Sequence, residues 1–378
     1  MFKKYITALG VILIMLTLLL SPDLCISAAK EGLLLWFNKV LPSLLPFIIL
    51  INILSQLNII RAISTVASPI TQKLWKLPGS SLVALIMGFI SGYPMGAKMI
   101  RELLDHEILS DHEAQKTLCF SNNCGPLFII GTVGTLMLKS SSMGYFLLFI
   151  HILSALLLSF VFSSYKCPST PKLRTASFLP EYSSFKFSTL LNEAVKNAMD
   201  TIVYIGGYII FFSVIARMIT NSSIILYMLK QQLITIIPPE ILPSFITGLL
   251  ELSNGISMLS AVNMSALYSL ALISFMIGFG GLCVHFQTSY ILGHRNFSLT
   301  PYIISKFMQG ILSFILVFIF YPVFCIPQLK VSLSYEIKWL AVLILLLVLF
   351  IYVVKCLNFS VYKKCMSHSK VHYTYPYK

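Results

Sequence analysis

The sequence is poor in charge. Of its 378 residues, 11% are Asp, Glu, Lys or Arg, against roughly 25% in a typical soluble domain. This scarcity, with 57% hydrophobic residues and a mean hydropathy of +0.87, excludes a water-soluble globular fold. Apolar runs of about 20 residues, the length that crosses a bilayer core, recur along nearly the whole chain. The sequence therefore predicts an all-α polytopic membrane protein in a lipid bilayer.

The sequence also lacks the motifs of several protein classes. It contains no nucleophile elbow with a Ser-His-Asp arrangement, no HExxH motif and no phosphate-binding loop, so we expect no enzyme and no catalytic residue. The eight cysteines are scattered, without a CxxC pair or a His/Cys cluster, which predicts no metal site and no cofactor. Basic residues outnumber acidic ones 27 to 13, but they lie in short connections, so no nucleic-acid partner is expected.

The apolar runs predict eight transmembrane helices. They cover residues 6–22, 33–58, 117–138, 143–163, 197–216, 265–292, 300–326 and 338–354. Two further apolar stretches, 81–97 and 242–262, are interrupted by glycine, proline or polar residues, and we interpret both as re-entrant broken hairpins. With both termini cytoplasmic, 19 of the 27 Lys and Arg residues fall inside and six outside, as the positive-inside rule requires.

The same order of features occurs twice, about 160 residues apart: a span, an amphipathic stretch, a broken hairpin and a broken span. The charge count gives the copies opposite orientations, and such inverted repeats are common in carriers. The predicted organisation is an N-terminal helix (1–30), a first repeat (31–163), a basic cytoplasmic loop (164–190), a second inverted repeat (191–298), C-terminal helices (299–354) and a basic cytoplasmic tail (355–378). Cleavage of residues 1–27 as a signal peptide is left open, although a retained helix is favoured.

The broken segments of the first half predict a solute site. Irregular backbone at membrane depth is tolerated only where protein or a water-filled cavity covers it. A half-helix starting near Pro94 would direct free N–H groups and a positive dipole end at a carboxylate or phosphate, and paired carboxamides can both donate and accept. The candidate solute-binding residues here are Ser91, Gly92, Tyr93, Pro94, Lys98, Ser121, Asn122, Asn123, Gly125 and Pro126.

The second half contributes Ser253, Asn254 and Gln287 as solute-binding candidates, and Glu251 with His285 as a candidate ion-coupling pair. Ionisable groups at membrane depth are costly and usually functional, and this pair would bind H⁺ or Na⁺. A buried structural Glu–His contact is the alternative. His151 and Lys306 are interpreted as isolated polar residues in otherwise apolar spans.

Several runs in residues 30–325 resemble a known family: LPSLLPF at 41–47, SGYPMGAK at 91–98, SNNCGPLFIIG at 121–131 and GLLE at 248–251. They are similar to the nucleoside-recognition (Gate) family and, within it, to the YlbJ family of sporulation integral membrane proteins. The resemblance implies a multi-pass protein of the mother-cell or outer forespore membrane that moves dipicolinate, a small aromatic dianion, toward the forespore. The alternatives are a carrier of nucleosides or other small solutes and a non-transporting factor in spore assembly. Self-association, or association with other sporulation membrane proteins, is left open.

Overall fold

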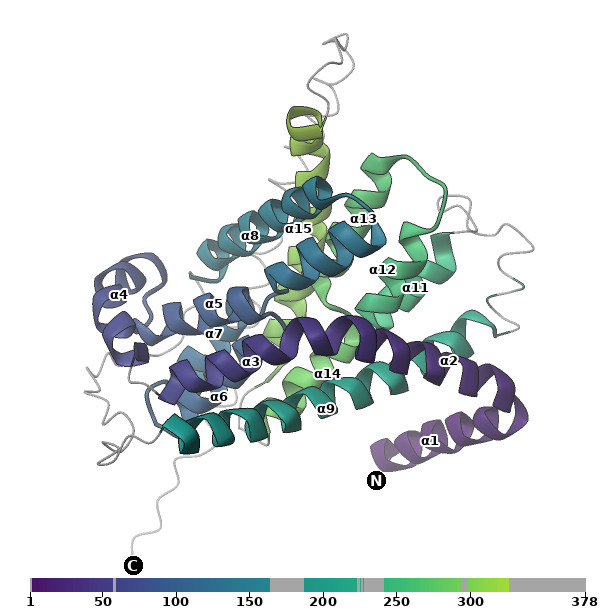
Figure 1. Cartoon of the computed structure of the whole chain (residues 1–378), viewed down its shortest axis with the longest axis horizontal. Helices are drawn as coiled ribbons and strands as arrows, with labels where there is room; N and C mark the ends of the chain where they lie inside the picture. The colour runs from purple at the N-terminus through teal and green to yellow at the C-terminus, as the bar shows by residue number, and fades with distance from the viewer. Residues whose placement is uncertain are drawn as a thin grey trace, which may run out of the picture.

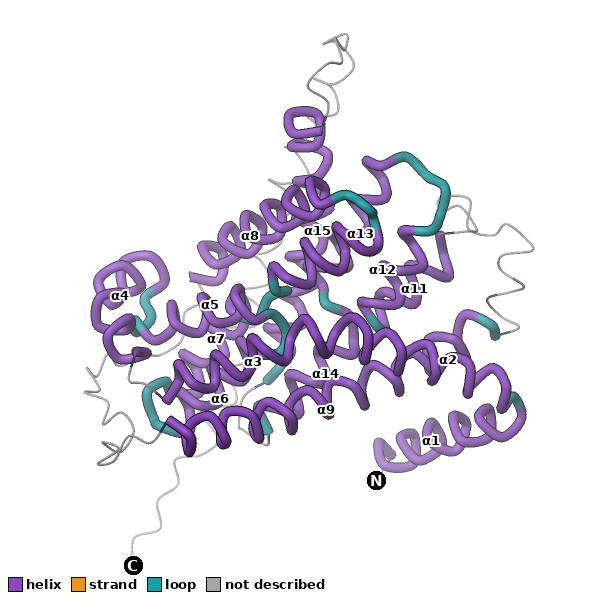
Figure 2. The backbone as a smooth tube through the Cα atoms, viewed as in Figure 1, coloured by secondary structure: helices purple, strands orange, loops and turns teal. Residues whose placement is uncertain are grey.

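A computed structural model of the chain describes residues 2–56, 59–163, 187–222, 225, 227, 241–293 and 298–325. All regular secondary structure in this part is helical (Figure 2). The elements are α1 (Phe2–Leu20), α2 (Pro22–Leu35), η1 (Trp36–Val40), α3 (Leu41–Gln56), α4 (Ile59–Trp75), α5 (Ser80–Ser91), α6 (Met95–Asp105), α7 (Asp111–Ser121), η2 (Leu127–Met137), α8 (Ser141–Ser163), α9 (Phe187–Thr220), α11 (Ile241–Leu250), α12 (Leu252–Ser260), α13 (Ala266–Phe279), α14 (Gly281–Leu292) and α15 (Thr300–Cys325). The two η elements are π-helical.

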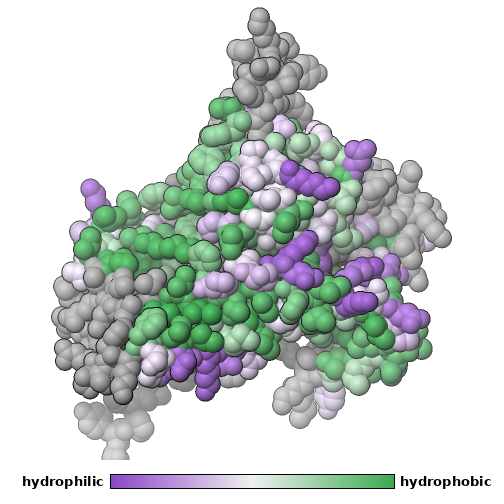
Figure 3. Space-filling view, in the orientation of Figure 1, coloured by the Kyte–Doolittle hydropathy of each residue, from purple (hydrophilic) through white to green (hydrophobic). Residues whose placement is uncertain are grey.

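Five helical segments in the described ranges are long and apolar enough to cross a membrane, or six if the bent pair α4–α5 is one span. The five cover residues 22–53, 141–162, 187–220, 266–292 and 300–324. Hydrophobic side chains (green) predominate over the coloured part of the face in Figure 3, and hydrophilic ones (purple) form smaller groups at its centre, right side and lower edge. The predicted polytopic α-helical membrane fold is confirmed. The span predicted at 338–354, most of the 164–190 loop and the 355–378 tail lie outside the described residues.

The boundary between the first two helices differs from the predicted one. The second span begins at Pro22 instead of residue 33, because a proline in the first turn of α2 starts a new helix directly after α1. Cys25, Ala28 and Gly32 are buried at helical spacing on one face of α2, which packs against α9. Lys30 and Glu31, which fall between the two predicted spans, lie on exposed positions of this helix.

The segment from α2 through η1 to α3 runs antiparallel to α9, and both are seen side by side in Figure 1. A Cβ atom on Gly32 would lie 2.6 Å from the Ser213 Oγ. Further along, the Trp36 Nε1 donates to the Ile202 carbonyl at 3.1 Å. These contacts fix the register of a two-helix layer that borders the two hairpins.

Each predicted re-entrant segment forms a pair of helices folded back on each other. A Cβ on Gly88 of α5 would lie 3.4 Å from the Gly96 Cα of α6. In the second pair, a Cβ on Gly255 of α12 would lie 2.1 Å from the Gly248 Cα of α11. Close approach of the two helices therefore requires glycine in the second pair. In the first pair, the Ser121 carbonyl oxygen of α7, 1.7 Å from the Gly88 Cβ position, is what requires glycine. We call residues 92–94 the first tip and Glu251 the second tip.

Each hairpin is followed by two helices that are separated by a break where the sequence predicts an interruption. The first break, residues 122–126, separates α7 from η2, and the second break, at Gly280, separates α13 from α14. Gly280 has φ +84°, in the left-handed region that glycine adopts without strain. A long helix then follows in both halves, α8 and α15. The opposite membrane orientation of the halves and the domain boundaries stay predictions.

Candidate solute-binding site

Within each half, the hairpin tip contacts the break of the following span. A Cβ on Gly92, at the first tip, would lie 2.6 Å from the Gly125 backbone nitrogen in the first break. A Cβ on Gly281, beside the second break, would lie 3.4 Å from both the Leu250 carbonyl oxygen and the Leu252 backbone nitrogen, which flank the second tip. The same pairing of tip and break therefore recurs in the two halves.

Side chains also join the two halves to each other. The ring of Tyr93, from the first tip, lies against Gly280, whose Cβ position is 3.3 Å from the tyrosine Cζ. The Asn122 Nδ2, in the first break, donates to the Thr288 Oγ1 at 2.9 Å and to the Tyr302 hydroxyl at 2.8 Å. Both tips and both breaks thus converge on one region of the molecule.

A small pocket of about 60 Å³ lies at this convergence, and we call it the central pocket. Apolar side chains from η1, α3 and α9 line part of it, together with Cys124 and Cys283. Six of the predicted residues line it as well: Gly92, Tyr93, Gly125, Glu251, Ser253 and Gln287. Residues more than 190 positions apart in the sequence, such as Gly92 and Gln287, therefore share one pocket.

Two larger pockets adjoin α9. The Asp200 pocket, about 140 Å³, is lined by Pro94, Asp200, Thr201 and Gln287 among others, and the Arg217 pocket, about 360 Å³, includes Asn254 in its lining. The other predicted residues line none of these three pockets; they are Ser91, Lys98, Ser121, Asn122, Asn123, Pro126 and His285. Their roles in solute binding stay predictions.

Lys98 joins α6 to the two-helix layer. Its Nζ donates to the Asn52 Oδ1 on α3 and to the Thr201 Oγ1 on α9, each at 3.2 Å. Thr201 lines the Asp200 pocket, so the ammonium lies next to this pocket. In the structure, the Lys98 side chain therefore links α6 to α3 and α9 by hydrogen bonds.

Glu251 is buried, and its carboxylate caps the N-terminus of α12. It accepts hydrogen bonds from the backbone nitrogens of Ser253 at 3.0 Å and Asn254 at 2.7 Å. An anionic cap at this position satisfies free N–H groups and the positive end of the helix dipole. Helix α6 begins directly after Pro94, as predicted, but Pro94 provides no side-chain cap. At the first tip the Met95 backbone nitrogen donates to the Gly92 carbonyl at 2.9 Å, and the N-terminus of α6 has no side-chain cap. The N-terminus of α12, in contrast, carries the Glu251 carboxylate.

The predicted pair of Glu251 and His285 does not form a contact among the described residues. Cys283 and Gln287 line the central pocket with Glu251, whereas His285, two residues from each, points about 200° away around α14. Its ring packs edge-on to Phe279 at 4.8 Å and Tyr302 at 5.3 Å between centroids. Neither ring nitrogen has a hydrogen-bond partner in the described part of the chain.

Lys306 and His151 are not isolated, and the interpretation of them as such was wrong. Lys306 is completely buried, and its Nζ donates to the Asn123 Oδ1 at 3.1 Å and to the Gln309 Oε1 at 2.7 Å. The Cys124 backbone nitrogen in the first break donates to the His151 Nε2 at 3.0 Å. This network holds the first break against α8 and α15.

A pattern on α15 could have indicated the network. Ser305, Lys306, Gln309 and Ser313 recur at helical spacing and are all completely buried. Polar residues that share one face of a membrane helix point to a protein interior and not to lipid. Lys306 is one member of this polar face, and the spacing of the face, more than the single lysine, indicates a buried environment.

Comparisons with known proteins agree with the geometry. The nucleoside-recognition (Gate) family model matches residues 37–140, from η1 through the first hairpin to just after the first broken span. The chain is 29% identical over 315 residues to the sporulation integral membrane protein YlbJ of Bacillus subtilis strain 168. The alignment covers 78% of this chain and 77% of that protein.

The predicted resemblance is confirmed. The relative is a sporulation integral membrane protein by name, which agrees with the apolar spans of this chain. The family match covers the first half, so the likeness of the second hairpin to the first rests on the sequence pattern and on the structure. No solved structure matches the chain.

Proposed function

We propose that this chain is a sporulation membrane carrier for a small aromatic dicarboxylate such as dipicolinate, moved from the mother cell toward the forespore. The observation that carries the proposal is the convergence of both hairpin tips and both span breaks on the central pocket. Broken helices at a shared site near mid-membrane are the usual plan of secondary carriers. The chain takes no catalytic role in this proposal.

The pockets along α9 support a solute route. The Asp200 pocket is lined by Thr201 on α9, the central pocket by Ile205 and Ile209, and the Arg217 pocket by residues up to Thr220. At 1.5 Å per residue, the helix from Thr201 to Thr220 spans about 30 Å, the thickness of a bilayer core. One face of α9 therefore follows a row of pockets across the membrane.

The size of the central pocket defines how it would work. At about 60 Å³ it is far below the roughly 300 Å³ or more of ordinary small-molecule sites. A ring-sized solute enters only when the tips move apart, which is the motion that two opposed repeats can provide. Glu251, at the second tip, is the group that would couple this motion to H⁺ or Na⁺.

Charge favours an anion at the first tip and polar hydroxyls at the second. The uncapped start of α6 and the buried ammonium of Lys306, 5.7 Å from the Tyr93 ring centroid, favour a carboxylate there. Glu251 and Gln287 line the same pocket and could bind the hydroxyl and amide groups of a nucleoside. A nucleoside, consistent with the description of the matching family, is therefore the second candidate. A non-transporting role in spore assembly is the third.

The test is uptake of labelled dipicolinate and labelled uridine into proteoliposomes. We expect dipicolinate uptake that is lost in the double variant Asn123→Ala, Glu251→Ala. Gly207→Ala is the matched control, because a Cβ there meets nothing within 4 Å. Uridine uptake alone would establish the nucleoside carrier, and uptake of neither by folded protein would favour the assembly role.

A further inference from the structure

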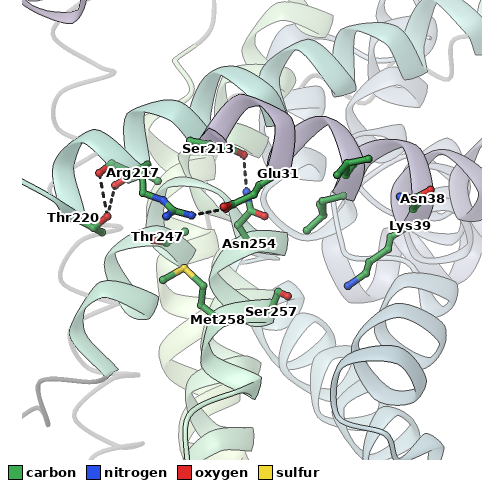
Figure 4. Close-up of a pocket in the computed structure, with 14 residues that line it drawn as sticks. Glu31, Asn38, Lys39, Ser213, Arg217, Thr220, Thr247, Asn254, Ser257 and Met258 are labelled. Carbon is green, nitrogen blue, oxygen red and sulfur yellow. Dashed lines mark hydrogen bonds and ion pairs between the residues drawn. The ribbon is translucent and has the colours of Figure 1, made fainter. Parts of the chain in front are cut away.

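The Arg217 pocket is bounded by α2, η1, α9 and the second hairpin (Figure 4). Thr247 of α11 and Asn254, Ser257 and Met258 of α12 line its hairpin side. Its volume of about 360 Å³ lies within the range of small-molecule sites. A ligand here would contact both the two-helix layer and the hairpin that carries Glu251.

The ionisable lining of this pocket is two cations and one carboxylate. Arg217 and Lys39 are basic, and Glu31 is acidic. Figure 4 shows Glu31 paired with Arg217 between α2 and α9, while Lys39 extends from η1. Within the described part of the chain, no hydrogen bond or ion pair engages Lys39. The pocket therefore has one more positive charge than its own carboxylate offsets.

The Glu31–Arg217 pair is easily exchanged. The two side chains are 53% and 36% exposed, respectively, and an ion pair this open to solvent contributes at most about 1 kcal/mol. The guanidinium can form two parallel hydrogen bonds with an incoming carboxylate. A dicarboxylate solute could thus replace Glu31 on Arg217 and place its second charge on Lys39.

Hydrogen bonding connects this pocket to the second tip. The Asn254 Nδ2 donates to the Ser213 Oγ of α9 at 2.6 Å, while the Asn254 backbone nitrogen donates to Glu251. Ser213 and Asn254 both line the Arg217 pocket. A ligand in this pocket therefore lies beside a residue that holds the carboxylate of the central pocket.

We propose that the Arg217 pocket is a second binding site for the carboxylates of the solute, held by Arg217 and Lys39 after displacement of Glu31. This inference deepens the proposed function and rests on an anionic solute. The Arg217 pocket would then be a transient binding site for the solute at one end of the row of pockets along α9. Glu31 is then a competitor that limits affinity.

The experiment measures occupancy of this pocket alone. Ser257→Cys introduces a thiol in the lining, and its modification by N-ethylmaleimide in detergent-solubilised full-length protein is followed by peptide mass spectrometry. We expect dipicolinate to slow the modification and uridine to leave it unchanged. Arg217→Gln should raise the half-protecting dipicolinate concentration about tenfold or more, and Lys39→Gln about threefold.

Glu31→Gln is the most informative variant, because its effect should have the opposite direction. Loss of a competing carboxylate should lower the half-protecting dipicolinate concentration by about threefold. Misfolding cannot produce tighter binding. Lys30→Gln, an exposed neighbour on α2, is the matched control and should leave the concentration unchanged. No protection by dipicolinate, or protection indifferent to Arg217→Gln, would overturn the proposal.

Two further results distinguish a solute site from a lipid site and binding from transport. If phosphatidylglycerol in nanodiscs protects Ser257→Cys and dipicolinate does not, the pocket binds a lipid headgroup and the solute proposal is wrong. If dipicolinate protects the thiol with the expected Arg217 dependence but no uptake occurs in proteoliposomes, the second site stands and the carrier function fails.

Discussion

The first hairpin with its broken span and the second hairpin with its broken span share a backbone plan but differ in charge. In both, backbone packs closely against a hairpin glycine, Gly88 or Gly255, and the tip contacts the break. The first break is held by an ammonium, Lys306, through Asn123. The second tip is a carboxylate, Glu251, which caps its own helix.

This difference in charge distinguishes the two halves as places for a charged solute. Because the start of α6 has no side-chain cap and Lys306 lies behind the Tyr93 ring, we expect an anion to bind in the first half. The second half already holds a negative charge at the corresponding helix start. Variants that affect the shared backbone should therefore act alike in both halves, whereas variants of charged groups should not.

The largest loss of stability is expected at the closely packed glycines, which are the feature that the two halves share. Gly88→Ala places a Cβ 1.7 Å from the Ser121 carbonyl oxygen, and Gly255→Ala places one 2.1 Å from the Gly248 Cα. Because backbone must shift in both cases, we expect each to cost about 3 kcal/mol of stability, measured by thermal unfolding in detergent. Gly207→Ala, with open space around its Cβ, is the control. A neutral Gly255→Ala would break the likeness between the hairpins.

Lys306→Met tests the cation of the first half. It removes the donor to Asn123 and Gln309, and we expect dipicolinate uptake to fall at least about tenfold, or about 1.4 kcal/mol in transition-state free energy. Lys116→Met, at another buried lysine that bonds the Trp75 carbonyl, is the matched control and should reduce stability without a specific loss of uptake per folded protein. Normal uptake by Lys306→Met would remove the anion argument for the first half.

Glu251 variants test the carboxylate of the second half. Glu251→Ala removes the acceptor for two backbone N–H groups and should cost about 1 kcal/mol, whereas Glu251→Gln keeps an acceptor oxygen. If the carboxylate opposes an anionic solute until a proton neutralises it, wild-type uptake rises as pH falls. Uptake by Glu251→Gln should then be insensitive to pH. Unchanged pH dependence in this variant would exclude Glu251 as the coupling group.

The smallest effect is expected at His285. Neither of its ring nitrogens is hydrogen-bonded among the described residues, and its ring packs against Phe279 and Tyr302. His285→Phe preserves aromatic packing and removes two buried polar atoms, so stability should change by less than about 1 kcal/mol. Retained, ion-dependent uptake would assign coupling to Glu251 alone. A large loss of stability would reveal a partner of the ring.

The positions of the interruptions were predictable from the sequence because glycine and proline act locally. Pro94, Gly125 and Gly280 interrupt apolar runs, and each lies at or beside a break in the structure. The start of the second span was not predictable in this way, because Lys30 and Glu31 interrupt the apolar run although they lie on the exposed side of α2.

Long-range partners could not be predicted in the same way. Lys306 donates a hydrogen bond to Asn123, which lies 183 positions away in the sequence, and no local sequence pattern specifies this contact. Cys283 and His285 are neighbours in sequence, but helical geometry directs only the first of them into the central pocket. Sequence therefore identified the segments of the candidate site better than its side-chain partners.

The most direct test of the account is solute protection of the native thiols in the central pocket. Cys124 and Cys283 both line it, whereas Cys25 is buried on α2 outside that lining. Their modification by a small methanethiosulfonate reagent in proteoliposomes can be quantified separately by mass spectrometry. The account predicts that dipicolinate slows modification of Cys124 and Cys283 but not of Cys25. Equal rates with and without saturating dipicolinate or uridine would contradict a solute site where the two tips meet.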